Sequence, residues 1–209
     1  MKTKPFFRWI ASVVLFSVCQ FTYADDYSVW LTQENGFIEV TTEQGLRQGD
    51  NVFYVLRDAQ NPALVLRADR YQEKPDWAPG GTRALRYTSA SNTPVLDTNM
   101  YFQFGYSAGA GYAMKCVANP EHFFQTHDNA GFMWVNTFNE TTVSEWDAIT
   151  PAFADGVWTF AVNKFPQGGW WGSGNYLGPW TESIGVTEQM AIAANKTFQD
   201  ASRFKIYSI

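Results

Sequence analysis

The sequence predicts an all-β domain in which short strands close into a barrel built from three repeats. Four segments share an alternation of aromatic and apolar residues and recur roughly every 45 to 57 residues, as expected for one supersecondary unit in several copies. Helix signals are few, and the aromatic content of 17% suits a barrel filled by large side chains. The four segments are 52–55 (VFYV), 101–104 (YFQF), 157–160 (VWTF) and 203–206 (RFKI).

Twelve stretches along the chain have the period-2 or short apolar pattern of β-strands. Each is separated from the next by turn residues, among them Asn35-Gly36, Asn119-Pro120 and Asp155-Gly156. Two further segments, 141–149 and 198–201, are predicted as single helical turns. The predicted strands are, in order, 27–32, 36–42, 52–57, 63–68, 84–89, 100–106, 112–117, 132–138, 157–162, 175–178, 189–194 and 202–208.

The first 24 residues have the layout of a cleaved secretory signal. Three basic residues, Lys2, Lys4 and Arg8, precede an apolar run at 10–18 and a small-residue end at 22–24. We expect cleavage after Ala24 and a secreted or periplasmic protein. The alternative is a lipoprotein acylated at Cys19, although the preceding residue is bulky. No later stretch reaches the 18 or so apolar residues of a transmembrane segment.

Charge and cysteine content restrict what the exported chain can do. Without its signal the chain keeps 12 basic and 20 acidic residues, a formal charge of about −8, and the basic residues are scattered. This excludes a nucleic-acid-binding protein, which needs a clustered basic surface. Only Cys116 remains, so no internal disulfide can form. We expect a single domain over 25–209, with repeats at about 50–104, 105–160 and 161–209. The oligomeric state stays open.

One segment carries a family resemblance. Residues 174–178 (GNYLG), followed by 184–186 (IGV), 191–194 (AIAA) and 201–206 (ASRFKI), resemble one repeat of the β-trefoil superfamily, which includes fascin-type actin-crosslinking domains and ricin-type lectins. Looser copies make the resemblance cover about 50–209. It implies a β-trefoil-like closed barrel, to which 25–49 adds an N-terminal hairpin. The ricin-type Gln-x-Trp signature is missing, because Gly156 stands where the glutamine would precede Trp158. Sugar-site residues therefore cannot be carried over.

The densest candidate for a binding site is the glycine-rich aromatic segment 168–182. Its glycines permit sharp loops and leave no neighbouring side chains to cover the indoles. An indole can pack against the C–H face of a pyranose while nearby polar groups bind hydroxyls, or it can anchor a protein partner. The alternative is that Trp170 and Tyr176 merely pack under the barrel. The predicted ligand-binding residues are Trp170, Trp171, Asn175, Tyr176, Trp180 and Glu182.

Catalytic and metal-binding readings are weaker. Cys116 with His122 resembles a thiol and base, and His122 with His127 resembles part of a metal site. However, Cys116 lies in an apolar strand, and the two histidines lack a third ligand. We therefore interpret all three as structural and predict no catalytic residue, metal or cofactor.

The sequence favours a non-enzymatic binding protein that recognises a glycan or a surface receptor through exposed aromatic residues in its loops. One alternative is a secreted toxin or virulence factor that damages target cells. Another is a polysaccharide hydrolase, because acidic residues such as Asp76, Glu145 and Asp147 lie in long loops, where binding residues are commonly found. No phosphate loop or hydrolase elbow accompanies them.

Overall fold

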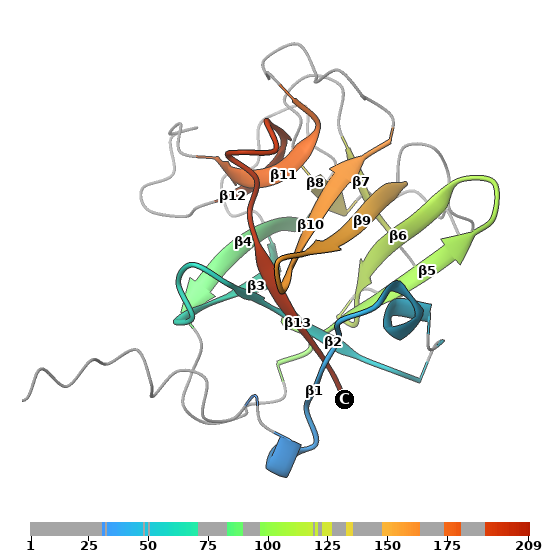
Figure 1. Cartoon of the computed structure of the whole chain (residues 1–209), viewed down its shortest axis with the longest axis vertical. Helices are drawn as coiled ribbons and strands as arrows, with labels where there is room; N and C mark the ends of the chain where they lie inside the picture. Colours follow the sequence, from blue (N-terminus) through green and yellow to red (C-terminus); the bar gives the residue numbers. More distant parts are fainter. Residues whose placement is uncertain are drawn as a thin grey trace, which may run out of the picture.

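The computed structural model describes residues 31, 33–47, 49, 51–70, 83–89, 97–118, 120, 123–126, 133–135, 148–163, 174–180 and 191–209. These residues form thirteen β-strands joined by antiparallel pairings, together with two short 3-10 helices (Figure 1). The predicted signal at 1–24 lies outside this part of the chain.

Twelve of the strands fall into three consecutive units of four, and a short N-terminal segment precedes them. The N-terminal segment contains η2 (Gln33–Asn35), β1 (Ile38–Glu39) and η3 (Glu43–Arg47). The first unit contains β2 (Tyr54–Asp58), β3 (Leu64–Arg70), β4 (Arg83–Ser89) and β5 (Phe102–Ser107). The second contains β6 (Gly111–Cys116), β7 (Phe124–Thr126), β8 (Met133–Val135) and β9 (Ile149–Ala154). The third contains β10 (Val157–Val162), β11 (Tyr176–Trp180), β12 (Ala191–Lys196) and β13 (Phe204–Ser208).

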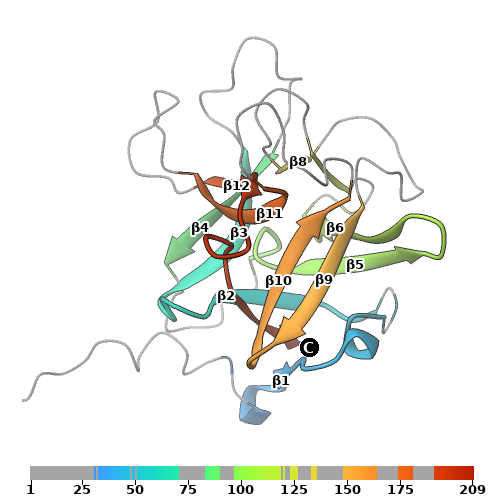
Figure 2. The same cartoon turned by 45° about the horizontal axis from the view of Figure 1, so that its top comes forward.

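The first and last strands of each unit form a closed ring. Within a unit, β2 pairs with β5, β6 with β9, and β10 with β13; between units, β5 pairs with β6, β9 with β10, and β13 with β2. The middle strands form three hairpins, and β4 pairs with both β8 and β12 (Figures 1 and 2). The result is a six-stranded barrel with a layer of hairpins attached to it.

The three units repeat the same pairings at equivalent positions. Tyr54, Tyr112 and Trp158 each mark the point where the first strand meets the last strand of its own unit. Three residues further on, Arg57, Lys115 and Ala161 each mark the pairing with the first segment of the hairpin. The equal spacing gives the barrel an internal threefold symmetry, although the residue types at these positions differ.

The main core fills the ring with aromatic side chains. Phe104 stacks on Phe160 with ring centroids 5.9 Å apart, and Phe160 lies 5.8 Å from Phe204, so one ring of the first unit and two of the third meet in the core. Leu56 and Met114 are buried in the same cluster. Burying a large apolar side chain stabilises the fold by about 1.5–3 kcal/mol, which explains how the barrel holds without a disulfide.

Most strands agree with the sequence prediction, but two were missed. Every predicted stretch overlaps a strand, apart from 27–32, of which only Leu31 is described. The sequence did not reveal β7 or β9, and residue 149, expected to end a helical turn, begins β9. Because β9 closes the second unit, the pairing places 157–160 at the start of the third unit rather than at the end of the second. Residues 197–200 form a turn closed by the bond from Asp200 N to Thr197 O.

The N-terminal segment makes a strand pairing that the sequence did not predict. Within the described part of 25–49, β1 is the one strand, and it pairs with β13 near the far end of the chain. Val40 N also donates to Ile206 O over 2.8 Å. The described part of the segment therefore joins the barrel, because β13 offers it an open edge and an apolar surface that includes Tyr207. Most of the first predicted strand of the hairpin, 27–32, lies outside the described residues.

Candidate functional site

An aromatic surface lies on the third unit beside the predicted segment. We call Tyr176, Phe198 and Arg203 the third-unit surface. The Tyr176 ring meets the Phe198 ring edge to face, with centroids 5.4 Å apart, and Arg203 Cζ lies 5.9 Å from the centre of the Phe198 ring. Phe198 is 47% exposed, which is unusual for so large an apolar side chain. The surface thus offers an aromatic platform with a cation beside it.

Local sequence explains why Phe198 points outward. The Thr197 hydroxyl donates to the Asp200 carboxylate over 2.8 Å, which tightens the turn between β12 and β13. Gly174 lies so close to the backbone of 196–197 that an added Cβ would fall 2.7 Å from the Lys196 carbonyl carbon. A glycine is needed there because the two chain segments touch. The glycine at this point therefore serves packing, and it brings β11 against the turn that carries Phe198.

The predicted ligand-binding residues have different outcomes. Tyr176 is half-buried and belongs to the third-unit surface. The Asn175 amide is engaged in the fold, since its Nδ2 donates to Val162 O over 3.0 Å. Trp180 ends β11, with its backbone paired to Ala191, and its side chain lies outside the described residues. Trp170, Trp171 and Glu182 also lie outside them, so their roles stay predictions. Sequence reasoning missed Phe198 and Arg203, whose signal was an apolar residue in the polar turn TFQD.

The structure gives Cys116 a structural setting. Its side chain is fully buried, and Sγ donates to Thr98 O over 3.3 Å. His122 and His127 lie outside the described residues, as do Asp76, Glu145 and Asp147. Among the residues that the structure does describe, no three metal-ligating side chains come together, and no helix is long and apolar enough to cross a membrane.

A second constellation lies at the end of the barrel away from the hairpins. Residues 37–47, which we call the plug segment, cross this end, and their Leu46 and Val40 are buried in the main core. The three symmetry-equivalent aromatic residues each donate a hydrogen bond to a carbonyl of this segment. The bonds run from Tyr54 to Gly45 O over 2.7 Å, from Tyr112 to Glu43 O over 3.4 Å, and from Trp158 Nε1 to Val40 O over 2.6 Å.

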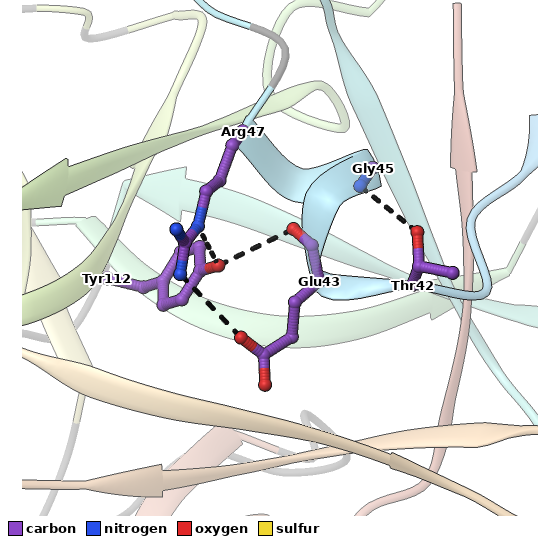
Figure 3. Close-up of polar contacts among 5 residues, drawn as sticks. All are labelled: Thr42, Glu43, Gly45, Arg47 and Tyr112. Atoms are coloured by element: carbon purple, nitrogen blue, oxygen red, sulfur yellow. Dashed lines mark hydrogen bonds and ion pairs between the residues drawn. The ribbon is translucent and has the colours of Figure 1, made fainter.

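The plug segment also places an arginine against two tyrosines of the β5–β6 hairpin. We call Glu43, Arg47, Tyr106 and Tyr112 the Arg47 cluster, of which Figure 3 shows Glu43, Arg47 and Tyr112. The guanidinium carbon lies 4.0 Å from the centre of the Tyr106 ring and 5.1 Å from that of Tyr112, and Nε donates to the Tyr112 hydroxyl over 2.5 Å. That hydrogen bond raises the pKa of Arg47, so the side chain stays charged. Sequence reasoning did not single out this cluster, because its members are separated by up to 69 residues.

Comparison with solved structures identifies the architecture. The chain is similar to a designed threefold-symmetric protein, ThreeFoil, with a TM-score of 0.50 and 9% identity, over 74% of this chain and 96% of that one. The fold is a β-trefoil. This confirms the predicted fold class and the predicted likeness to β-trefoil proteins over most of the chain.

Two further structures share the β-trefoil fold. One is a Caenorhabditis elegans protein of unknown function, with a TM-score of 0.51 and 11% identity, over 84% of this chain and 98% of that one. The other is a mosquitocidal holotoxin, with a TM-score of 0.53 and 11% identity; the match covers 78% of this chain and 17% of the holotoxin. No protein-family model matches the chain, and no curated protein does. At these identities the likeness establishes the fold alone.

Proposed function

We propose that this β-trefoil is an exported, non-enzymatic binding protein that recognises a glycan through the third-unit surface. The observation that carries the proposal is Phe198, which is 47% exposed and held edge to face against Tyr176 beside Arg203. An exposed aromatic face packs against the C–H face of a pyranose, and the guanidinium and phenol supply hydrogen bonds to its hydroxyls. Trp170 and Trp171, which precede Tyr176 by a few residues in the sequence, remain predicted ligand contacts.

Export and a soluble binding role support each other. The basic, apolar and small-residue layout of 1–24 matches a secretory signal, and the acidic chain that follows would meet glycans outside the cytoplasm. A surface protein receptor is the alternative ligand, because exposed aromatic and arginine side chains also anchor protein interfaces.

A glycan-array screen of the chain from residue 25 tests the proposal. We expect specific binding that falls about tenfold in Phe198→Ala and in Trp171→Ala, which corresponds to a loss of about 1.4 kcal/mol. Ile38→Ala is the matched control, because Ile38 is also an exposed large apolar residue, on β1, and its loss leaves the third-unit surface intact. Near-UV circular dichroism confirms that each variant is folded.

Two other results would redirect the proposal. Binding to no glycan at all would contradict it and move a protein receptor to the front. Killing or permeabilisation of target cells by the purified chain would instead support the toxin hypothesis, since a protein that only binds glycans leaves cells intact.

A further inference from the structure

The Arg47 guanidinium is held in place but only loosely paired with a carboxylate. Stacking on Tyr106 and the bond from Nε to Tyr112 fix the plane of the group. The facing carboxylate oxygen of Glu43 lies 3.7 Å from Nη2, beyond hydrogen-bond distance, and the Glu43 side chain is 57% exposed. An exposed ion pair of this kind contributes little to stability. Glu43 is therefore a weak partner that another anion can displace.

Two donors of the cluster remain available. Within the part of the chain that the structure describes, no hydrogen bond is found to Arg47 Nη1 or to the Tyr106 hydroxyl. Arg47 is 36% exposed and Tyr106 is 48% exposed, so both can be reached from solvent. A guanidinium held by its Nε side presents its two terminal nitrogens outward, which is the arrangement that binds a carboxylate through two parallel hydrogen bonds.

We propose that the Arg47 cluster is a second ligand site, for a sugar residue that carries a carboxylate, and that this ligand holds the plug segment on the barrel. The carboxylate pairs with the Arg47 terminal nitrogens in place of Glu43, and the sugar ring lies against Tyr106. This inference rests on the proposed glycan-binding function but uses a different surface. Arg47 and Glu43 belong to the plug segment whereas Tyr106 and Tyr112 belong to the β5–β6 hairpin, so the site exists only while the plug segment is docked.

Binding measurements with two matched probes test the ligand class. The probes are an oligosaccharide ending in glucuronate and the same oligosaccharide ending in glucose, at about 150 mM salt, where repulsion from distant acidic residues is screened beyond about 8 Å. We expect the glucuronate probe to bind at least tenfold more tightly. Arg47→Lys should lose tenfold or more, since it keeps the charge but not the paired donors.

Glu43→Gln separates an acidic ligand from a neutral one. If Glu43 competes with the ligand carboxylate, removing its charge strengthens glucuronate binding severalfold. If Glu43 instead accepts hydrogen bonds from sugar hydroxyls, the same change weakens binding and overturns the inference. Equal affinity for the two probes, or no effect of Arg47→Lys, would overturn it as well.

Phe198→Ala distinguishes this inference from the proposed function. Glucuronate binding that survives Phe198→Ala but not Arg47→Lys assigns the acidic sugar to the Arg47 cluster. The opposite pattern assigns it to the third-unit surface and ends the inference while the proposed function stands. If Phe198→Ala weakens the binding of no glycan but Arg47→Lys weakens glucuronate binding, the proposed glycan site on the third-unit surface falls and the inference stands.

Hydrogen exchange tests the link to the plug segment. The Val40 amide of this segment donates to Ile206 O, and the Gly45 amide donates to Thr42 O within the segment. If undocking destroys the site, a ligand at 100 times its Kd slows their exchange about 100-fold. The Asp200 amide, in the turn of the third unit, is the control and should be unchanged. Unchanged exchange at Val40 and Gly45 in the presence of bound probe would contradict the linkage.

Discussion

Aromatic side chains at the plug end of the barrel and on the third-unit surface have different roles. At the plug end, Tyr54, Tyr112 and Trp158 are at most 4% exposed, and each polar atom donates to a backbone carbonyl. On the third unit, Phe198 is half exposed and has no polar atom to satisfy. An aromatic residue is therefore structural where neighbouring residues bury its ring and accept a hydrogen bond from it. It is free to contact a ligand where a turn, packed against Gly174, holds its ring in solvent.

Removing the Trp158 side chain should produce the largest difference in stability between the plug end and the third-unit surface. Its side chain is fully buried, packs 5.1 Å from the Phe153 ring and donates to Val40 O. Trp158→Ala is expected to lower the free energy of unfolding by about 3–5 kcal/mol, because it leaves a cavity and an unpaired carbonyl. Urea unfolding measures this. Phe198→Ala should change stability by less than about 0.5 kcal/mol, and an equal loss in both variants would break the distinction between the two regions.

Gly174→Ala should have an intermediate effect confined to the third unit. The new Cβ would meet the backbone of 196–197, which cannot move as freely as a side chain. We expect a loss of about 1–3 kcal/mol and faster exchange of the Asp200 amide. Gly109→Ala is the control, since nothing lies within 4 Å of its added Cβ. Equal stability of both variants would show that this glycine serves loop freedom rather than close packing.

Alkaline pH should have the smallest effect on the free energy of unfolding. It distinguishes buried tyrosine hydroxyls from exposed aromatic rings. Burial raises the pKa of Tyr87 above its usual value, outweighing the hydrogen bond to Ser202, which lowers it. The unfolded tyrosine ionises near pH 10, so this stability is present below pH 10 and is lost as pH rises towards the folded pKa. The loss is about 1.4 kcal/mol at pH 11. Tyr87→Phe should show a smaller fall in unfolding free energy between pH 9 and pH 11; an identical fall would contradict this assignment.

Local pattern predicted the strands well where it was strong. The predicted strands 100–106 and 157–162 match β5 and β10, although three consecutive residues of each strand are buried, and the Asp155-Gly156 turn is formed with positive φ at both residues. β9 was missed because Pro151 and the small residues of ITPAFA argue against a strand, although its side chains alternate in burial. β7 has only three residues, too few to show a period.

Long-range features could not be read from the chain. Tyr112 and Trp158 occupy equivalent places, yet they differ in type and their shared role depends on contacts up to 118 residues away. The stretch 25–49, which includes the plug segment, suggested a hairpin because the strand with which β1 pairs, β13, is far away in the sequence. Of the predicted ligand-binding residues, Tyr176 lies in the third-unit surface and Asn175 Nδ2 donates to Val162 O, and ligand binding by both stays a prediction. Phe198 and Arg203 were missed because they become neighbours only through the turn at 197–200.

The pairing of β13 with both β1 and β2 sets an order of events during synthesis. The Lys205 ammonium meets the Glu39 carboxylate 166 residues away, and the Ser208 hydroxyl donates to Ile38 O across 170 residues. Until β13 has been synthesised, the ring is open and β1 lacks the strand with which it pairs. Pairing of residues so far apart in sequence is slow, because the intervening chain must first close into a loop. The pairing of β13 with β1 and β2 should therefore be the slow step of folding.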